Sequence, residues 1–142
     1  MNRLRFLFPL LLVLLLGTVA SSCSKDDGAL TGSLLKAKLV QKWQLDELSL
    51  DGQVTDSGAA IKDRYTLLFR ADGTYVQTLM ADGTQYTGSW KFNEGDVVTL
   101  QLTDHKGNSR QYMVSTLTEK ELRYGATNTN GKLQEWRFSS TL

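Results

Sequence analysis

The sequence is poor in the residues that most catalytic and metal-binding chemistry requires. Its 142 residues include one cysteine (Cys23), one histidine (His105) and one proline (Pro9). One cysteine cannot form a disulfide within the chain. Without a second histidine or cysteine, zinc ligation and Ser-His or Cys-His nucleophile chemistry lack the necessary groups. Because the proline lies near the N-terminus, no later segment is barred from pairing as a central strand.

The charge is nearly balanced, with 16 basic and 15 acidic side chains. Nucleic-acid binding depends on clustered basic residues, so no nucleic-acid partner is expected. His105 lies in a turn-like polar segment, where a solvated side chain is typical. Asp46 and Glu47 are adjacent on an expected strand and should project to opposite faces, which does not suit an acid–base pair. The segment 128–131 lacks the ligand spacing of a calcium loop. We therefore predict no enzymatic activity, no catalytic residues, no metal site and no cofactor.

The N-terminal segment has the pattern of an export signal. Arg3 and Arg5 precede the apolar run Phe6–Leu16, which is shorter than the roughly 20 residues that a membrane-spanning helix requires. Ala20, Ser21 and Ser22 then precede Cys23, an arrangement that resembles a bacterial lipobox. The alternatives are an ordinary secretory cleavage near the same place or an uncleaved anchor. We expect residues 1–22 to be a lipoprotein signal peptide and Cys23 to be the lipidation site.

The lipobox resemblance implies several acyl chains on Cys23, and two or more chains hold a protein stably on a membrane. Residues 23–29 would then form the lipidated cysteine and a polar linker. Lys25, Asp26 and Asp27 resemble the surface-export signal of Bacteroidetes lipoproteins, although a plain solvated linker has the same composition. We expect an exported outer-membrane lipoprotein, on either the periplasmic side or the cell surface. Loss of the two arginines with the signal takes the formal net charge from +1 to −1.

The rest of the chain has the pattern of short antiparallel strands. The tetrapeptide Ala-Asp-Gly-Thr occurs at 71–74 and again at 81–84, each time between strand-like runs. Asp-Gly between such runs is a strong hairpin signal. Similar turn signals recur down to 130–131, which delimits eight strands. These comprise a first strand from about Trp43 to Leu50, then Tyr65–Arg70, Thr74–Met80, Gln85–Phe92, Val97–Thr103, Arg110–Leu117, Glu121–Ala126 and Leu133–Ser139.

The connections favour one architecture. After Tyr65 every link is short enough to join neighbouring strands, whereas a Greek-key sandwich needs long crossings. An unclosed meander would expose two long edges. We therefore predict an all-β fold, an eight-stranded antiparallel up-and-down barrel preceded by a short helix that Ser33 caps.

Two irregularities are expected around the first strand. Its apolar alternation changes phase between Leu45 and Leu48, which predicts a β-bulge or bend. The segment Gly52–Arg64 is predicted to be one long connection with a single helical turn at Ala59–Lys62.

The aromatic residues indicate which face of each strand points inward. In Gln85–Phe92, Tyr86 and Trp90 share one face with Gly88, which should let the strand bend or a neighbour approach closely. The two faces of Thr74–Met80 are nearly equally apolar, and of the two we favour the face with Tyr75 and Gln77 as the inward one. With the alternation of the other strands, this yields the candidate ligand-binding set: Tyr65, Leu67, Phe69, Tyr75, Gln77, Tyr86, Trp90, Tyr112 and Tyr124.

Several short motifs add a family resemblance. The Lys42-Trp43 pair, the Asp-Gly-Thr-Tyr hairpin at 72–75, the Gly-Ser-Trp at 88–90 and the closing Trp-Arg-Phe at 136–138 resemble the lipocalin-like lipoprotein domains of Bacteroidetes. The resemblance implies a lipocalin-like barrel domain over residues 30–142. It also implies a structural pair in which the guanidinium of Arg137 stacks over Trp43.

Small eight-stranded barrels either are filled by their own side chains or hold one small ligand. The inward tyrosines and Gln77 favour a small hydrophobic ligand. Short strands and large rings instead favour a filled barrel that serves as a non-catalytic protein–protein interaction module, with Gly52–Arg64 as its recognition loop. Both alternatives remain open from the sequence.

Overall fold

A computed structural model describes residues 34–141. The predicted signal peptide, the lipidation site Cys23, the polar linker and the helix cap Ser33 lie outside the described residues.

Within that range a helix over residues 34–39 precedes nine strands and one turn of 3₁₀ helix. The predicted strands are all present, with ends within two residues of those expected. The elements are β1 (Lys42–Leu50), β2 (Gln53–Ser57), η1 (Gly58–Ala60), β3 (Tyr65–Phe69), β4 (Thr74–Leu79), β5 (Gln85–Asn93), β6 (Thr99–Thr103), β7 (Ser109–Leu117), β8 (Glu121–Thr127) and β9 (Leu133–Ser140).

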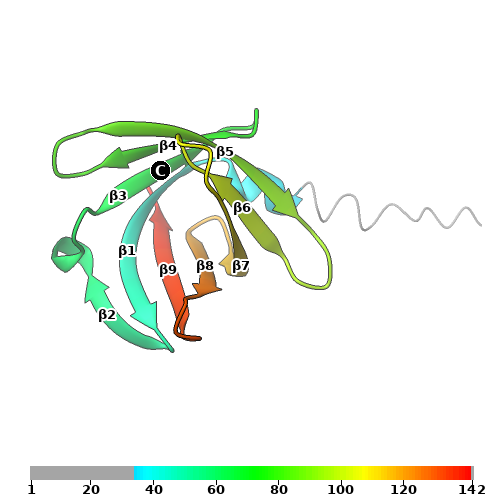
Figure 1. Ribbon diagram of the computed structural model, residues 1–142. Helices are drawn as coiled ribbons and strands as arrows, with labels where there is room; N and C mark the ends of the chain where they lie inside the picture. Colours follow the sequence, from blue (N-terminus) through cyan, green and yellow to red (C-terminus); the bar gives the residue numbers. More distant parts are fainter. Residues whose placement is uncertain (1–33, 142) are drawn as a thin grey trace, which may run out of the picture.

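The strands form a closed barrel, which confirms the predicted architecture (Figure 1). From β3 to β9 each strand pairs with the next in antiparallel orientation. β9 then pairs along nearly the whole of β1, from Trp43↔Ser140 to Leu50↔Gln134. The pairing of β1 with β3 is much shorter and ends at Gln44↔Thr66.

The strand β2 was not predicted, and the prediction of one long connection from Gly52 to Arg64 is wrong in this respect. β3 leaves β1 early, so the second half of β1 would have a free edge. β2 covers this edge and pairs with it from Glu47 to Leu50. Asp51 (φ 49°) and Gly52 (φ 78°) both adopt positive φ, as a two-residue hairpin turn requires. The helical turn is confirmed, but at Gly58–Ala60 rather than at Ala59–Lys62.

The predicted bulge in β1 is confirmed. The register of β1 against β9 shifts between Leu45 and Glu47, so that Asp46 is the extra residue. Leu45 is fully buried before the bulge, and Leu48 packs against the core after it. The inserted residue therefore lets both leucines point into the barrel although they are three residues apart.

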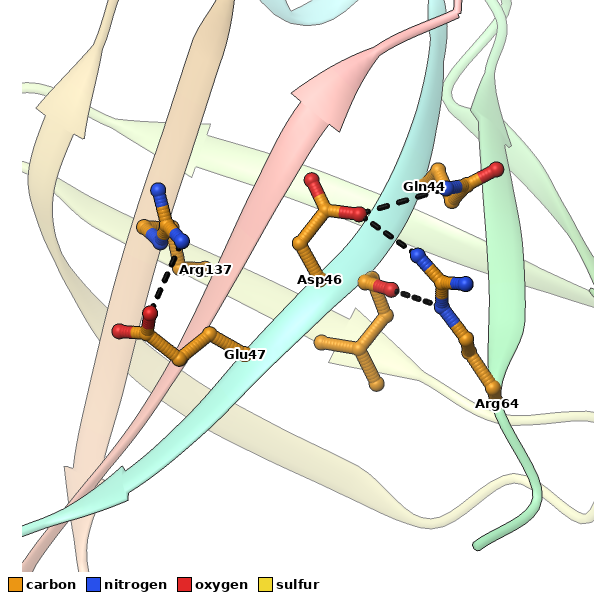
Figure 2. Close-up of polar contacts among 6 residues, drawn as sticks. Gln44, Asp46, Glu47, Arg64 and Arg137 are labelled. Carbon is orange, nitrogen blue, oxygen red and sulfur yellow. Dashed lines mark hydrogen bonds and ion pairs between the residues drawn. The ribbon is translucent and has the colours of Figure 1, made fainter. Parts of the chain in front are cut away.

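The bulge also places two consecutive carboxylates on the outer face, contrary to the expectation that Asp46 and Glu47 project to opposite faces. Figure 2 shows Asp46 bonded to Gln44 and Arg64, and Glu47 bonded to Arg137 on the other side of β1. Both ion pairs measure 2.8 Å. Burial alone would raise the pKa of Asp46, but hydrogen bonds from Ser139, Gln44 and Arg64 together hold that pKa below its usual value.

Arg64 closes the gap that opens where β3 separates from β1. Its Nε donates to the Leu45 carbonyl at 2.6 Å while its terminal nitrogen meets Asp46 (Figure 2). A carbonyl at the point of divergence has no ladder partner, and an unsatisfied polar group of this kind is costly when it is buried. One side chain thus replaces the missing backbone donor.

The predicted stacking of Arg137 over Trp43 is wrong. Trp136 and Phe138, its neighbours in β9, belong to the barrel interior, so alternation turns Arg137 outward to Glu47. The Trp43 indole is fully buried and donates instead to the Leu39 carbonyl at 3.0 Å.

The helix over residues 34–39 closes one end of the barrel. Leu39 is fully buried beside Trp43, and the Lys36 ammonium lies 5.5 Å from the centre of the Trp90 ring. The interior of this end is filled by side chains. The β4–β5, β6–β7 and β8–β9 turns lie at the opposite end, because the strands alternate in direction.

The two copies of the repeated tetrapeptide share their glycine conformation and their side-chain bond, although the second loop is one residue longer. The Gly73 N–H donates to the Arg70 carbonyl and the Gly83 N–H to the Leu79 carbonyl. In each copy only the glycine has positive φ, 84° at Gly73 and 75° at Gly83. The preceding aspartate accepts a hydrogen bond from the backbone N–H of the following threonine, at 2.9 Å in both copies. Aspartate therefore acts through its side chain, and glycine supplies the left-handed conformation.

Candidate ligand-binding site

The barrel contains a cavity of about 440 Å³ at the end away from the helix. The walls come from β3, β4 and β6–β8, and the β6–β7 turn forms part of the rim. The lining residues are Tyr65, Leu67, Tyr75, Gln77, Leu102, Asp104, Asn108, Ser109, Arg110, Tyr112 and Tyr124.

Four tyrosines on four different strands dominate this lining. The Tyr112 and Tyr124 rings lie 4.8 Å apart between centroids, and Tyr65 packs against Phe138 at 6.0 Å. Burial raises the pKa of Tyr65, Tyr75, Tyr112 and Tyr124. Their hydroxyls therefore stay protonated at neutral pH and can both donate and accept hydrogen bonds. A ligand would meet ring faces along its body and hydroxyls at fixed positions.

The remaining wall is a mixture of apolar and amide groups. Leu67 and Leu102 supply aliphatic surface, and Leu102 lies opposite Arg110 in the β6–β7 ladder. Gln77 is half-buried and adds one amide. The lining surface is thus about evenly divided between apolar and polar atoms. Small-molecule sites likewise combine apolar and aromatic walls with placed polar groups.

Asp104 is the acidic residue of the rim, and both of its carboxylate oxygens accept hydrogen bonds from residues of its own turn. Its Oδ1 accepts from the backbone N–H of Lys106 at 2.8 Å and of Asn108 at 2.9 Å. Its Oδ2 accepts from the Asn108 amide at 3.0 Å. The bonds from the Asn108 side chain and backbone lower the pKa of Asp104, so it is ionised and committed to the turn.

Arg110, the basic residue of the rim, is held by aromatic rings. Its Cζ lies 5.3 Å from the centre of the Tyr112 ring and 5.6 Å from that of Trp136. These two rings meet edge to face at 5.5 Å. The guanidinium thereby lies over the aromatic wall at the entrance, where the residue stays exposed to solvent.

Six of the nine residues predicted from the sequence line the cavity, namely Tyr65, Leu67, Tyr75, Gln77, Tyr112 and Tyr124. The other three have the expected inward or half-buried side chains but lie elsewhere. Phe69 and Trp90 pack edge to face at 5.8 Å near the closed end. The Trp90 indole donates to the carbonyls of Arg70 and Thr74. Tyr86 stacks on His105 of the β6–β7 turn, with 4.7 Å between ring centroids.

The predicted set omitted Leu102, Asp104, Asn108, Ser109 and Arg110. A signal for Arg110 was present in the sequence, because it is two residues before Tyr112 and four before Val114 and so shares their inward face. The turn residues carry no such signal, since a turn has no alternation.

The sequence left open whether the barrel is filled by its own side chains or contains a cavity, and the structure shows one of these at each end. The end beneath the helix is filled by side chains, and the other end holds the cavity. Over residues 34–141 there is no group of three or more His, Cys, Asp or Glu side chains that could hold a metal ion. Nor does that part of the chain contain a helix long and apolar enough to cross a membrane.

The fold is a small closed up-and-down β-barrel with a helix over one end and a cavity at the other. The comparison of families agrees with this class. The family model described as a lipocalin-like domain matches residues 39–124, more than half of the chain. The protein therefore belongs to the lipocalin-like domain family. No curated protein matches the chain.

Proposed function

We propose that the barrel binds a small hydrophobic ligand in the cavity at its open end. The observation that carries this proposal is the tyrosine-lined space of about 440 Å³. This volume lies within the roughly 300–1,000 Å³ of ligand sites. A structural interior would be expected to close such a space, because packing to crystal-like density is the rule in protein cores.

A cavity-filling variant tests this proposal. Gln77→Trp places an indole in the cavity from a half-buried position and removes no core side chain. Gln111→Trp places the same residue on the exposed, outward-facing side of β7 and serves as the control. Binding of fatty acids and haem-like pigments would be followed by thermal shift and native mass spectrometry. We expect binding that Gln77→Trp abolishes and Gln111→Trp retains, and equal binding by both variants would contradict the site.

We further propose that the protein is an exported lipoprotein anchored to the outer membrane through Cys23. The lipobox-like residues 20–23 and the preceding apolar run support this proposal. Cys23→Ala should move the protein from the membrane fraction to the aqueous fraction, and the N-terminal peptide of the wild type should carry the mass of its acyl chains. Protease treatment of intact cells would separate surface exposure, which Lys25-Asp26-Asp27 supports, from a periplasmic position.

A second candidate function is protein–protein recognition through β2. This strand pairs only with β1 among the described residues, and its Val54 side chain is 57% exposed. An open edge strand can accept a strand from a partner. A photo-crosslinking amino acid at position 54 should then yield a defined adduct in cells, while the same group at the exposed Lys91 of β5 should not. Equal labelling at both positions would argue against a specific interface.

A further inference from the structure

The entrance of the cavity contains a paired cationic and phenolic group. Arg110 and Tyr112 are two residues apart on β7, so both side chains lie on its inward face. The guanidinium is held over Tyr112 and Trp136 at 5.3 and 5.6 Å. Burial raises the pKa of Tyr112, and the positive charge of Arg110 opposes this rise, which places the charge close to the phenol.

This positive charge has no counter-ion in the part of the chain that the structure describes. The ion pairs there are Arg64–Asp46, Arg123–Glu121 and Arg137–Glu47. Asp104 is the other charged residue of the lining, and both of its oxygens are bonded within its own turn. The rim therefore presents an exposed guanidinium that is hydrogen-bonded to the neutral Tyr112 hydroxyl and is in no ion pair among the described residues, so its remaining N–H groups can meet a ligand.

From this arrangement we infer that the ligand is a small carboxylate-bearing amphiphile, with its carboxylate at Arg110 and Tyr112 and its apolar body between Leu67 and Leu102. The inference rests on the proposed ligand-binding function and specifies the chemical class of the ligand. A guanidinium matches a carboxylate with two parallel hydrogen bonds, which a lysine cannot provide. The apolar part would be held by the tyrosine rings, by Leu102 directly opposite Arg110 and by the buried Leu67.

The test compares octanoate with octan-1-ol, which share a chain and differ in charge. The full-length protein would be titrated calorimetrically in phosphatidylcholine nanodiscs, with empty nanodiscs as the blank. We expect octanoate to bind about tenfold more tightly than octan-1-ol, which corresponds to about 1.4 kcal/mol. Arg110→Gln should remove this preference, so that the two probes bind with equal affinity, and Arg110→Lys should retain only part of it.

Arg70→Gln is the matched control, because it removes one positive charge from an exposed position next to the β3–β4 turn, at the closed end. It should bind octanoate as the wild type does. Equal affinity of the wild type for both probes, or no effect of Arg110→Gln, would overturn the inference while leaving the cavity a ligand site. Failure of the wild type to bind either probe would contradict the proposed function itself. If Arg110→Gln does not fold, the comparison of the two probes on the wild type still decides.

Discussion

Gly88 in β5 is the position where packing inside the barrel leaves least room for a side chain. It lies opposite Tyr75 in the β4–β5 ladder. A Cβ placed on Gly88 would lie 2.6 Å from Cε1 and Cζ of the Tyr75 ring, and it would also clash with the Thr103 carbonyl oxygen of β6. The ring could rotate toward the cavity, but the carbonyl belongs to the β5–β6 ladder and cannot move without disturbing it. The predicted role of Gly88, close approach of a neighbour, is confirmed.

Gly88→Ala should therefore destabilise the barrel by overpacking. Forced insertion of a methyl group into a packed interior costs about 1–3 kcal/mol. For a domain of this size each kcal/mol lowers Tm by roughly 4 °C, so the expected fall is about 4–12 °C. Thermal denaturation followed by circular dichroism measures this directly. Gly95→Ala is the control, since a Cβ at Gly95 would have no atom within 4 Å and the φ of this residue is not positive.

The double variant Gly88→Ala/Tyr75→Leu separates the two clashes. A smaller side chain at position 75 removes the contact with the ring but not the contact with the Thr103 carbonyl. The two substitutions should therefore be less destabilising together than the sum of their separate effects. The close approach of Tyr75 to Gly88 would be refuted if Gly88→Ala and Gly95→Ala had the same Tm. It would also be refuted if the destabilisation of the double variant equalled the sum of those of Gly88→Ala and Tyr75→Leu.

Two further predictions concern titration and the β1–β3 junction. Because burial raises the pKa of Tyr65 and Tyr124 above 10.0, the unfolded chain loses these protons first as the pH rises. The free energy of unfolding should then fall above pH 10 by up to about 1.4 kcal/mol per pH unit for each tyrosine, and Tyr65→Phe should make this slope shallower in urea denaturation. Arg64→Met should lower the free energy of unfolding by about 1–3 kcal/mol, because the Leu45 carbonyl loses its donor and Asp46 its partner. An unchanged slope or an unchanged urea midpoint, respectively, would contradict these assignments.

The strands could be predicted from the sequence because their limits are local. The turns at Gly73, Gly83 and Gly131 each contain a glycine in the left-handed region and a side chain that accepts a hydrogen bond from a backbone N–H of the same turn. The strand β2 lacks apolar alternation, and nearly all of it is exposed. Its existence depends on β3 leaving β1 at Gln44, which is a feature of tertiary pairing. No pattern within residues 53–57 encodes that event.

The sequence predicted which side chains point into the barrel, but it did not predict their positions along the barrel axis. Alternation along a strand indicates which side chains point inward, and it does so correctly for Leu67 and Trp90. It left the face of β4 undecided, where Tyr75 and Val76 are both buried. It does not indicate how far along the barrel axis a side chain lies, and that position separates the cavity from the filled end. The axial position follows from the N-terminal helix, which packs Leu39 beneath Trp43. Arg110 was not included in the predicted ligand-binding set because charged side chains usually face solvent.

Because the filled end and the cavity lie at opposite ends of the barrel, substitutions can alter ligand binding and stability separately. The closed end depends on contacts such as the Trp43 indole bonded to the Leu39 carbonyl, and none of these residues lines the cavity. The rim depends on the β6–β7 turn, where Asp104 satisfies the backbone donors without help from the rest of the barrel. A substitution at Arg110 should therefore alter affinity with little change in Tm, and a substitution at Trp43 should do the reverse. Independence of this kind is what lets loops on a rigid scaffold carry recognition.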